Sequence, residues 1–141
     1  MENKFLITVI GIQEIDGEKD KIEVITTGDI KEKDGKKYIS YTEYDNENPN
    51  IKVNTVVEAD ENCVTITRTG DVSSRMILEK DIRHSCQYTN SLGDMMIGVF
   101  TDCITDSLTL AGGELFVSYQ LDFNCDFVSN NELHIIVKEK V

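Results

Sequence analysis

Residues 20–45 read DKIEVITTGDIKEKDGKKYISYTEYD, a stretch that is typical of a β-hairpin. The dipeptide Asp34-Gly35 separates two runs in which apolar and polar residues alternate. Asp-Gly between such runs favours a two-residue turn, because both central residues of a type I′ turn need a positive φ angle. The alternation places every second side chain of a run on one face of a sheet. The stretch therefore predicts two neighbouring antiparallel strands.

The composition extends this prediction to an all-β fold. Of 141 residues, 40 are Ile, Val or Thr and only 10 are Ala or Leu. Side chains branched at Cβ fit a pleated strand, whereas Ala and Leu favour helices. Strands are predicted in the segments 3–14, 20–32, 36–45, 51–60, 63–69, 74–81, 84–90, 93–105, 113–124 and 132–139. Most connections between them are too short for a crossover helix, so neighbouring strands must run antiparallel.

A closed up-and-down β-barrel, formed by residues 1–141 as a single domain, is the expected architecture. An antiparallel sheet of about 8–10 strands tends to curl, and closure removes the exposed edges that invite aggregation. A β-sandwich is the alternative. The side chains expected to face the core include Ile22, Val24, Thr26 and Ile30 of the second strand and Leu115, Val117, Tyr119, Leu121 and Phe123 of the ninth. Asp16-Gly17 is predicted as a turn like Asp34-Gly35, and Asn130-Asn131 as a turn before the last strand.

Charge limits the classes of partner. The chain has 26 acidic and 14 basic residues and a formal charge of −12, which argues against nucleic acid and against an anionic membrane. No run approaches the roughly 18 apolar residues of a membrane helix, and the N-terminal stretch lacks the features of a signal peptide. The cytosol is therefore the expected location. The oligomeric state stays open.

The cysteines are expected to be free thiols, because the cytosol keeps thiols reduced. The chain contains Cys63, Cys86, Cys103 and Cys125. Their spacing lacks the close pairs that zinc sites use, so the sequence predicts no metal and no cofactor. Cys103 alternates in phase with Ile97 and Val99 and is expected to face the interior.

Polar residues in phase with core positions are the candidates for a binding site. Glu43 alternates with Tyr41, and Arg68 alternates with Ile66, so a carboxylate and a guanidinium each lie on an expected inner face. The third and fifth strands of an up-and-down barrel run in the same direction, so both charges approach the same end. The ligand-binding candidates are Glu43, Arg68, Tyr41, Ser74, Tyr88, Met95 and Tyr119.

The predicted Glu43–Arg68 pair leaves three interpretations open. An internal ion pair would fix the strand register, since an unpaired buried charge is costly. A ligand clamp would use the planar donor fork of the guanidinium at a barrel mouth, where small-molecule sites are common. An enzyme would use Glu43 as an acid or base and Arg68 as an electrostatic stabiliser.

The corresponding function hypotheses belong to different classes. The first is a binding protein for a small, largely apolar or amphipathic ligand, with an anionic head group near Arg68. The alternative is a structural or interaction module with a filled interior. An enzyme is the third, although no catalytic residue is assigned because the sequence does not demonstrate a cavity large enough for a substrate.

Several short motifs together resemble a known family. They are TTGDIKEKDGKKYISYTE (26–43), VTITRTG (64–70), RMILE (75–79), QYTNSLG (87–93) and GGELFVSYQL (112–121). In this order and spacing the chain is similar to the YwiB-like family of bacterial proteins, a domain of unknown function that is similar in fold to calycins, the lipocalin-type barrels. The resemblance covers nearly the whole chain. It implies a closed β-barrel, and it implies neither an activity nor catalytic residues.

Overall fold

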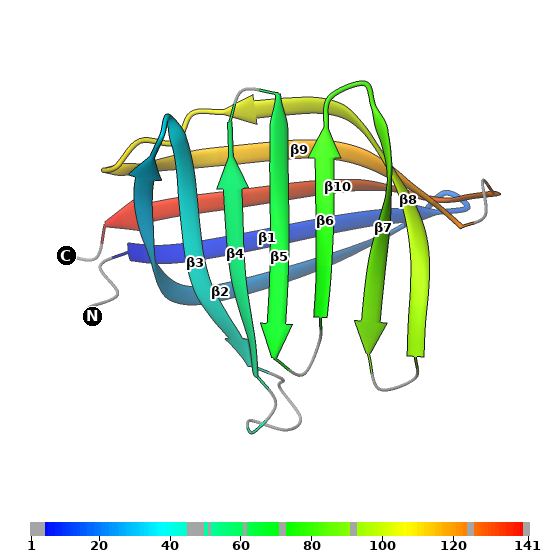
Figure 1. Ribbon diagram of the computed structural model, residues 1–141, viewed down its shortest axis with the longest axis horizontal. Helices are drawn as coiled ribbons and strands as arrows, with labels where there is room; N and C mark the ends of the chain where they lie inside the picture. Colours follow the sequence, from blue (N-terminus) through cyan, green and yellow to red (C-terminus); the bar gives the residue numbers. More distant parts are fainter. Residues whose placement is uncertain are drawn as a thin grey trace.

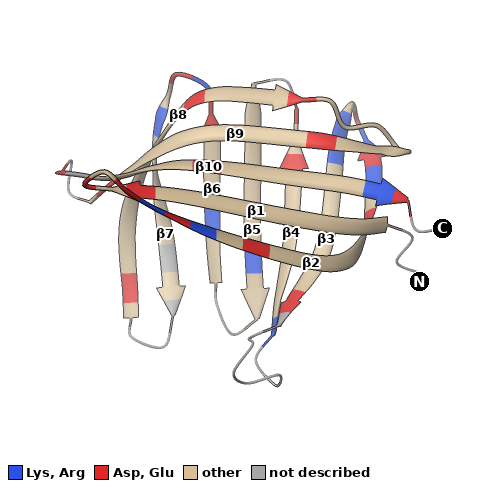
Figure 2. Cartoon of the chain, turned by 180° about the vertical axis from the view of Figure 1, so that it is seen from behind, with Lys and Arg blue, Asp and Glu red and all other residues tan. Residues whose placement is uncertain are grey.

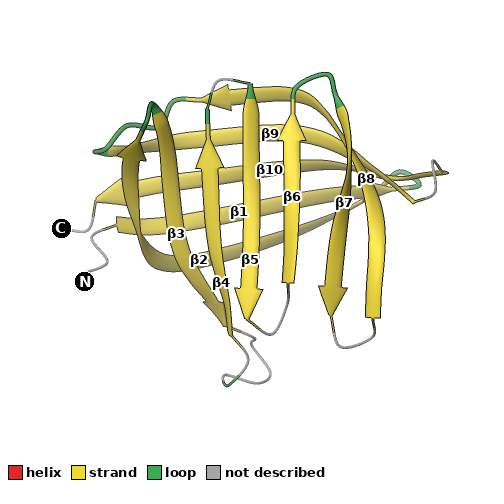
Figure 3. Cartoon of the chain, viewed as in Figure 1, coloured by secondary structure: helices red, strands yellow, loops and turns green. Residues whose placement is uncertain are grey.

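The computed structural model is an antiparallel barrel of ten strands (Figure 1). The structure describes residues 5–44, 50, 52–60, 62–70, 73–90, 93–123 and 126–139, with the backbone alone for Tyr44, Tyr88, Asn90 and Phe127. The strands are β1 (Phe5–Ile15), β2 (Glu18–Lys33), β3 (Lys36–Tyr44), β4 (Lys52–Ala59), β5 (Cys63–Gly70), β6 (Ser73–Glu79), β7 (Arg83–Asn90), β8 (Gly93–Asp106), β9 (Gly112–Phe123) and β10 (Asp126–Glu139). The described part of the chain contains no helix (Figure 3), and hence none that could cross a membrane.

Each strand pairs with the next one in the sequence, and β1 also pairs with β10. The predicted closed up-and-down barrel is therefore confirmed. Figure 1 shows that β3 to β7 form one wall, while β1, β9 and β10 cross behind them as a second wall. Strands β2 and β8 bend and contribute to both walls. The interior lies between the two crossing walls.

The two predicted Asp-Gly turns are confirmed. Asp16-Gly17 and Asp34-Gly35 have φ angles of 51° and 82°, and of 54° and 80°, as a type I′ turn requires. The predicted turn at Asn130-Asn131 is wrong, because both residues lie within β10 and pair with Gln120 and Tyr119 of β9.

Strand β2 bends between the two walls (Figure 1). Within this strand, Gly28 pairs with Phe5 on β1 and with Tyr41 on β3. A Cβ atom added to Gly28 would overlap the carbonyl oxygen of Ser40 and the Cδ1 atom of Ile7. A glycine within a strand often marks a bend at a barrel corner or a close backbone approach. Gly28 therefore allows β2 to pass close to the neighbouring wall.

Strand β8 contains an irregularity that changes the predicted side-chain pattern. Its register against β9 shifts between Thr101 and Cys103. The shift reverses the alternation, so Cys103 is exposed and Ile104 packs against the core. The prediction that Cys103 faces the interior is therefore wrong.

Cys63, Cys86 and Cys103 are free, as predicted. Cys125 lies outside the described residues.

Apolar side chains fill the end of the barrel at which β3 begins. The largest fully buried ones are Ile7, Ile39, Val57, Val64, Leu78, Val99, Leu115, Val117, Ile135 and Val137. Leu108 in the β8–β9 connection is 3% exposed and belongs to the same core. Lys37 Nζ on β3 donates to the Leu108 carbonyl at 2.7 Å and lies 3.3 Å from the Asp106 carboxylate. Because β3 and β8 are not neighbours in the sheet, these contacts span the barrel end and close it.

The other end is more open, because some strands extend past their neighbours. The pairing of β2 with β3 begins at Gly28, so the earlier residues of β2 pair only with β1 in the described structure. Ile22, expected in the core, is 68% exposed, and Phe123 at the end of β9 is 47% exposed. Both expectations are wrong, because no strand of the opposite wall covers these strand ends in the described part of the chain.

Candidate functional site

A pocket of about 210 Å³ lies at the open end of the barrel. It is lined by Val9, Tyr41, Glu43, Thr55, Ile66, Arg68, Ser74, Met76, Tyr119 and Leu133. These residues come from both walls, and their side chains are in phase with core positions farther along the same strands. The interior is therefore filled at the Leu108 end and hollow at the opposite end. We call this space the mouth pocket.

Most of the predicted site residues meet at the mouth pocket, namely Tyr41, Glu43, Arg68, Ser74 and Tyr119. Met95 does not line it and is 43% exposed. In the described structure Met95 lies on the part of β8 that pairs with β7 but not with β9, whose ladder with β8 begins at Gly98. The backbone of Tyr88 pairs with Ser74 and Met95, and its side chain lies outside the described part.

Glu43 and Arg68 form the predicted ion pair. Arg68 Nη2 donates to Glu43 Oε2 at 3.1 Å, and Thr55 Oγ1 donates to the same oxygen at 2.7 Å. The Arg68 and Glu43 side chains are 32% and 24% exposed, so solvent screens the pair. Among the described residues, the other Arg68 N–H groups and Glu43 Oε1 have no partner. The pair therefore has hydrogen-bonding capacity left for a ligand.

Two tyrosines contribute neutral phenols to the walls of the pocket. Burial raises the pKa of Tyr41 well above its ordinary value, and the Glu43 carboxylate adds to this effect, while Arg68 and Thr55 oppose it. Burial likewise raises the pKa of Tyr119. Both side chains stay protonated near neutral pH and combine an apolar ring with a polar hydroxyl.

We expect the free energy of unfolding to fall as the pH rises above about 10, the ordinary pKa of tyrosine. The unfolded chain then loses the Tyr41 proton while the folded chain keeps it, so alkaline pH favours unfolding. Tyr41→Phe should make this decline shallower in urea denaturation series from pH 8 to 11. Equal declines in the variant and the wild type would contradict the burial of the phenol.

A second hollow of about 430 Å³, which we call the amide groove, adjoins the mouth pocket at Tyr119. It is lined by Gly11, Ile12, Gln13, Asp20, Lys21, Ile22, Tyr119, Asn131 and Glu132. Asn131 is 6% exposed, and its amide nitrogen donates to Ser129 Oγ at 3.0 Å. Gln13 Nε2 lies 3.5 Å from the same hydroxyl.

The polar residues of the amide groove were not predicted as site residues, although their positions in the sequence carry a signal. Gln13 is in phase with Ile7 and Val9, and Asn131 is in phase with Leu133. This is the pattern that selected Glu43 and Arg68 on other strands. The dipeptide Asn130-Asn131 concealed it, because that pair is typical of turns.

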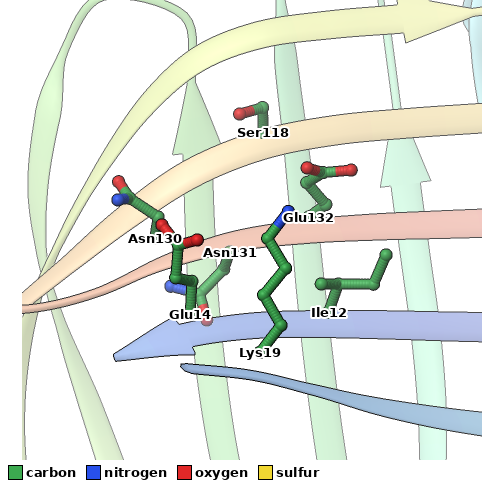
Figure 4. A pocket seen from close by; sticks show the side chains of 7 residues that line it. All are labelled: Ile12, Glu14, Lys19, Ser118, Asn130, Asn131 and Glu132. Atoms are coloured by element: carbon green, nitrogen blue, oxygen red, sulfur yellow. The ribbon is translucent and has the colours of Figure 1, made fainter. Parts of the chain in front are cut away.

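The outer side of the same wall carries a hollow of about 190 Å³ (Figure 4). Its lining includes the Lys19 side chain, which extends toward Glu132, and the Glu14 carboxylate. Figure 2 shows that charged residues are concentrated along β2 and toward strand ends and turns. Among the residues that the structure describes, no cluster of His, Cys, Asp or Glu is placed to hold a metal ion.

The chain is similar to known proteins over most of its length. It is 28% identical over 120 residues to the uncharacterized β-barrel protein YwiB of Bacillus subtilis (strain 168), a match that covers 85% of this chain and 82% of that protein. The crystal structure of the ywiB protein from Bacillus subtilis matches with a TM-score of 0.87 and 24% sequence identity, covering 99% of this chain and 93% of the other. This structural likeness supports the barrel fold.

A family described as a domain of unknown function (DUF1934) matches residues 7–135. The match begins in β1 and ends in β10, so it includes every strand of the barrel at least in part. The chain therefore belongs to the DUF1934 family.

Proposed function

We propose that the chain binds a small, largely apolar molecule in the mouth pocket, with its polar head group at Arg68. The volume of the pocket carries this proposal. At about 210 Å³ it exceeds the roughly 150 Å³ of a cavity that takes up benzene and is smaller than the roughly 300 Å³ of the smallest drug-sized sites. A molecule with one ring or a short branched chain fits this volume, whereas a long acyl chain exceeds it.

The chemistry of the lining supports an anionic head group. Val9, Ile66, Met76 and Leu133 supply apolar walls. The Arg68 guanidinium lies beside them, and its remaining donors suit the two oxygens of a carboxylate.

A titration series with single-ring probes tests the proposal. Benzoate, benzamide and benzylamine share one ring and differ in their head group. We expect benzoate to produce saturable NMR shifts in the backbone amides of the pocket strands. Arg68→Met should weaken benzoate binding about tenfold or more, because a charge-assisted hydrogen bond is lost.

Arg75→Met is the matched control. Arg75 pairs with Thr67 across β5 and β6, is exposed, and does not line the mouth pocket. Equal losses of benzoate affinity in Arg68→Met and Arg75→Met would show only a general effect of the protein's charge. No saturable shift with any of the three probes would refute the proposal and favour the interaction module.

We also infer a cytosolic location. The free thiols of Cys63, Cys86 and Cys103 support it, because a reducing compartment keeps cysteines unpaired.

A further inference from the structure

We propose that the amide groove is a second subsite of the same binding site and takes a hydrogen-bond-donating group, an amine or a hydroxyl, of an elongated ligand. The inference rests on the proposed function, because the apolar part of this ligand occupies the mouth pocket. Tyr119 lines both hollows, so the two adjoin at its side chain. The amide groove has about 430 Å³, roughly twice the volume of the mouth pocket.

Gly11 is the first observation that supports this subsite. Its backbone is not in the left-handed region, and a Cβ atom added to it would meet nothing within 4 Å. Gly28 is different, because a Cβ atom there would overlap Ser40 and Ile7. A glycine weakens the interior of a strand, and it often marks a place where a ligand approaches the backbone. The fold does not require glycine at position 11, and the glycine leaves a space that the described protein does not fill.

The polarity of the groove specifies the class of ligand group. Asn131 Nδ2 donates to the Ser129 carbonyl at 3.3 Å and to its hydroxyl at 3.0 Å. Because a carbonyl oxygen can only accept, these contacts fix the orientation of the amide and direct Oδ1 away from Ser129.

Acceptors outnumber donors among the hydrogen-bonding groups left on the inner side of the groove, where the Tyr119 hydroxyl and the Gln13 amide can each donate and accept. Asn131 Oδ1 has no partner among the described residues, and the side chain is nine-tenths buried beside the groove. The Asp20 carboxylate lines the same space. Lys21 is the only lysine or arginine of the lining, and the strand alternation directs it to the outer face of β2. A ligand group that donates an N–H or O–H therefore complements the inner side of the groove.

Three probes of equal size test this inference. They are 4-butylbenzoate, 4-(3-hydroxypropyl)benzoate and 4-(3-aminopropyl)benzoate, which differ only in the terminal group. Isothermal titration of the full chain should show the two donor probes binding about tenfold more tightly than the butyl probe. Equal binding of all three by the wild-type chain would overturn the inference without the use of any variant.

The variant Gly11→Val tests whether the preference for the donor probes arises in the amide groove. A Cβ atom at this position would meet nothing within 4 Å, so the valine side chain would extend into the groove, and valine is compatible with a strand. We expect it to abolish the preference for the donor probes and to leave the affinity for plain benzoate unchanged. Thr8→Val is the control, because it adds no side chain to the inner face of the same strand. Retention of the preference in Gly11→Val would overturn the inference.

Benzoate separates this inference from the proposed function. If benzoate binds and the elongated probes gain nothing from their donor groups, the mouth pocket stands and the amide groove is not a subsite. If benzoate does not bind, the proposed function fails. In that case, a donor preference that Gly11→Val removes would still assign the amide groove as a binding site for the donor group. The absence of such a preference would overturn both the proposed function and this inference.

Discussion

Gly28→Val is expected to lower the free energy of unfolding by about 3 kcal/mol or more, the upper part of the range for overpacking. The added side chain would overlap the backbone carbonyl of Ser40, which lies on the neighbouring strand β3. Relief requires β2 and β3 to separate where Gly28 pairs with Tyr41. Urea denaturation monitored by circular dichroism measures the loss.

Gly11→Val is the matched control for this measurement. It makes the same substitution at another inward-facing glycine, where an added Cβ atom meets nothing within 4 Å. Its free energy of unfolding should stay within about 1 kcal/mol of the wild type. Similar losses in the two variants would show that the cost comes from the amino-acid change itself and not from the close approach at β2.

Thr101→Val is expected to raise the free energy of unfolding by about 1–2 kcal/mol, although it removes a polar group and adds no contact. Thr101 on β8 is 0% exposed, and its hydroxyl has no hydrogen-bond partner in the described part of the chain. A buried hydroxyl without a partner has lost its hydration and gained nothing in return. Replacing it with a methyl group of similar size removes this cost.

The substitution Thr55→Val should change the free energy of unfolding in the opposite direction. Thr55 is also buried, at 1% exposure, but its hydroxyl donates to Glu43 Oε2 at 2.7 Å. The substitution should lower the free energy of unfolding by about 1–3 kcal/mol, because it removes a hydrogen bond to a charged group. Parallel urea melts of the two variants compare one substitution in two environments. A loss of stability in Thr101→Val would indicate that its hydroxyl has a partner in solution.

The features that the sequence predicted depend on local patterns. Asp16-Gly17 and Asp34-Gly35 form turns because positive φ angles are specified by the turn residues themselves. The approach of Glu43 to Arg68 followed from strand parity alone, since every second residue and every second strand have the same orientation.

The features that the sequence did not predict depend on distant parts of the chain. The bulge in β8 that exposes Cys103 is a single additional residue, and the alternation gives no sign of it until β9 is in place. Asn131 belongs to a strand because Tyr119 pairs with it, which overrides the turn preference of its own dipeptide. The contact between Lys37 and Asp106 depends on how the β8–β9 connection crosses the barrel end.

During synthesis the barrel cannot close before its last strand has been made, because the second neighbour of β1 is β10. Phe5 pairs with Glu139, so this ladder joins distant parts of the sequence and is expected to form slowly. Until then β1 is an edge strand with a row of unpaired backbone groups, which can pair with another unfinished chain. Production of the folded protein therefore depends on how quickly β10 reaches β1 after translation, and a chain that stops within β9 should aggregate.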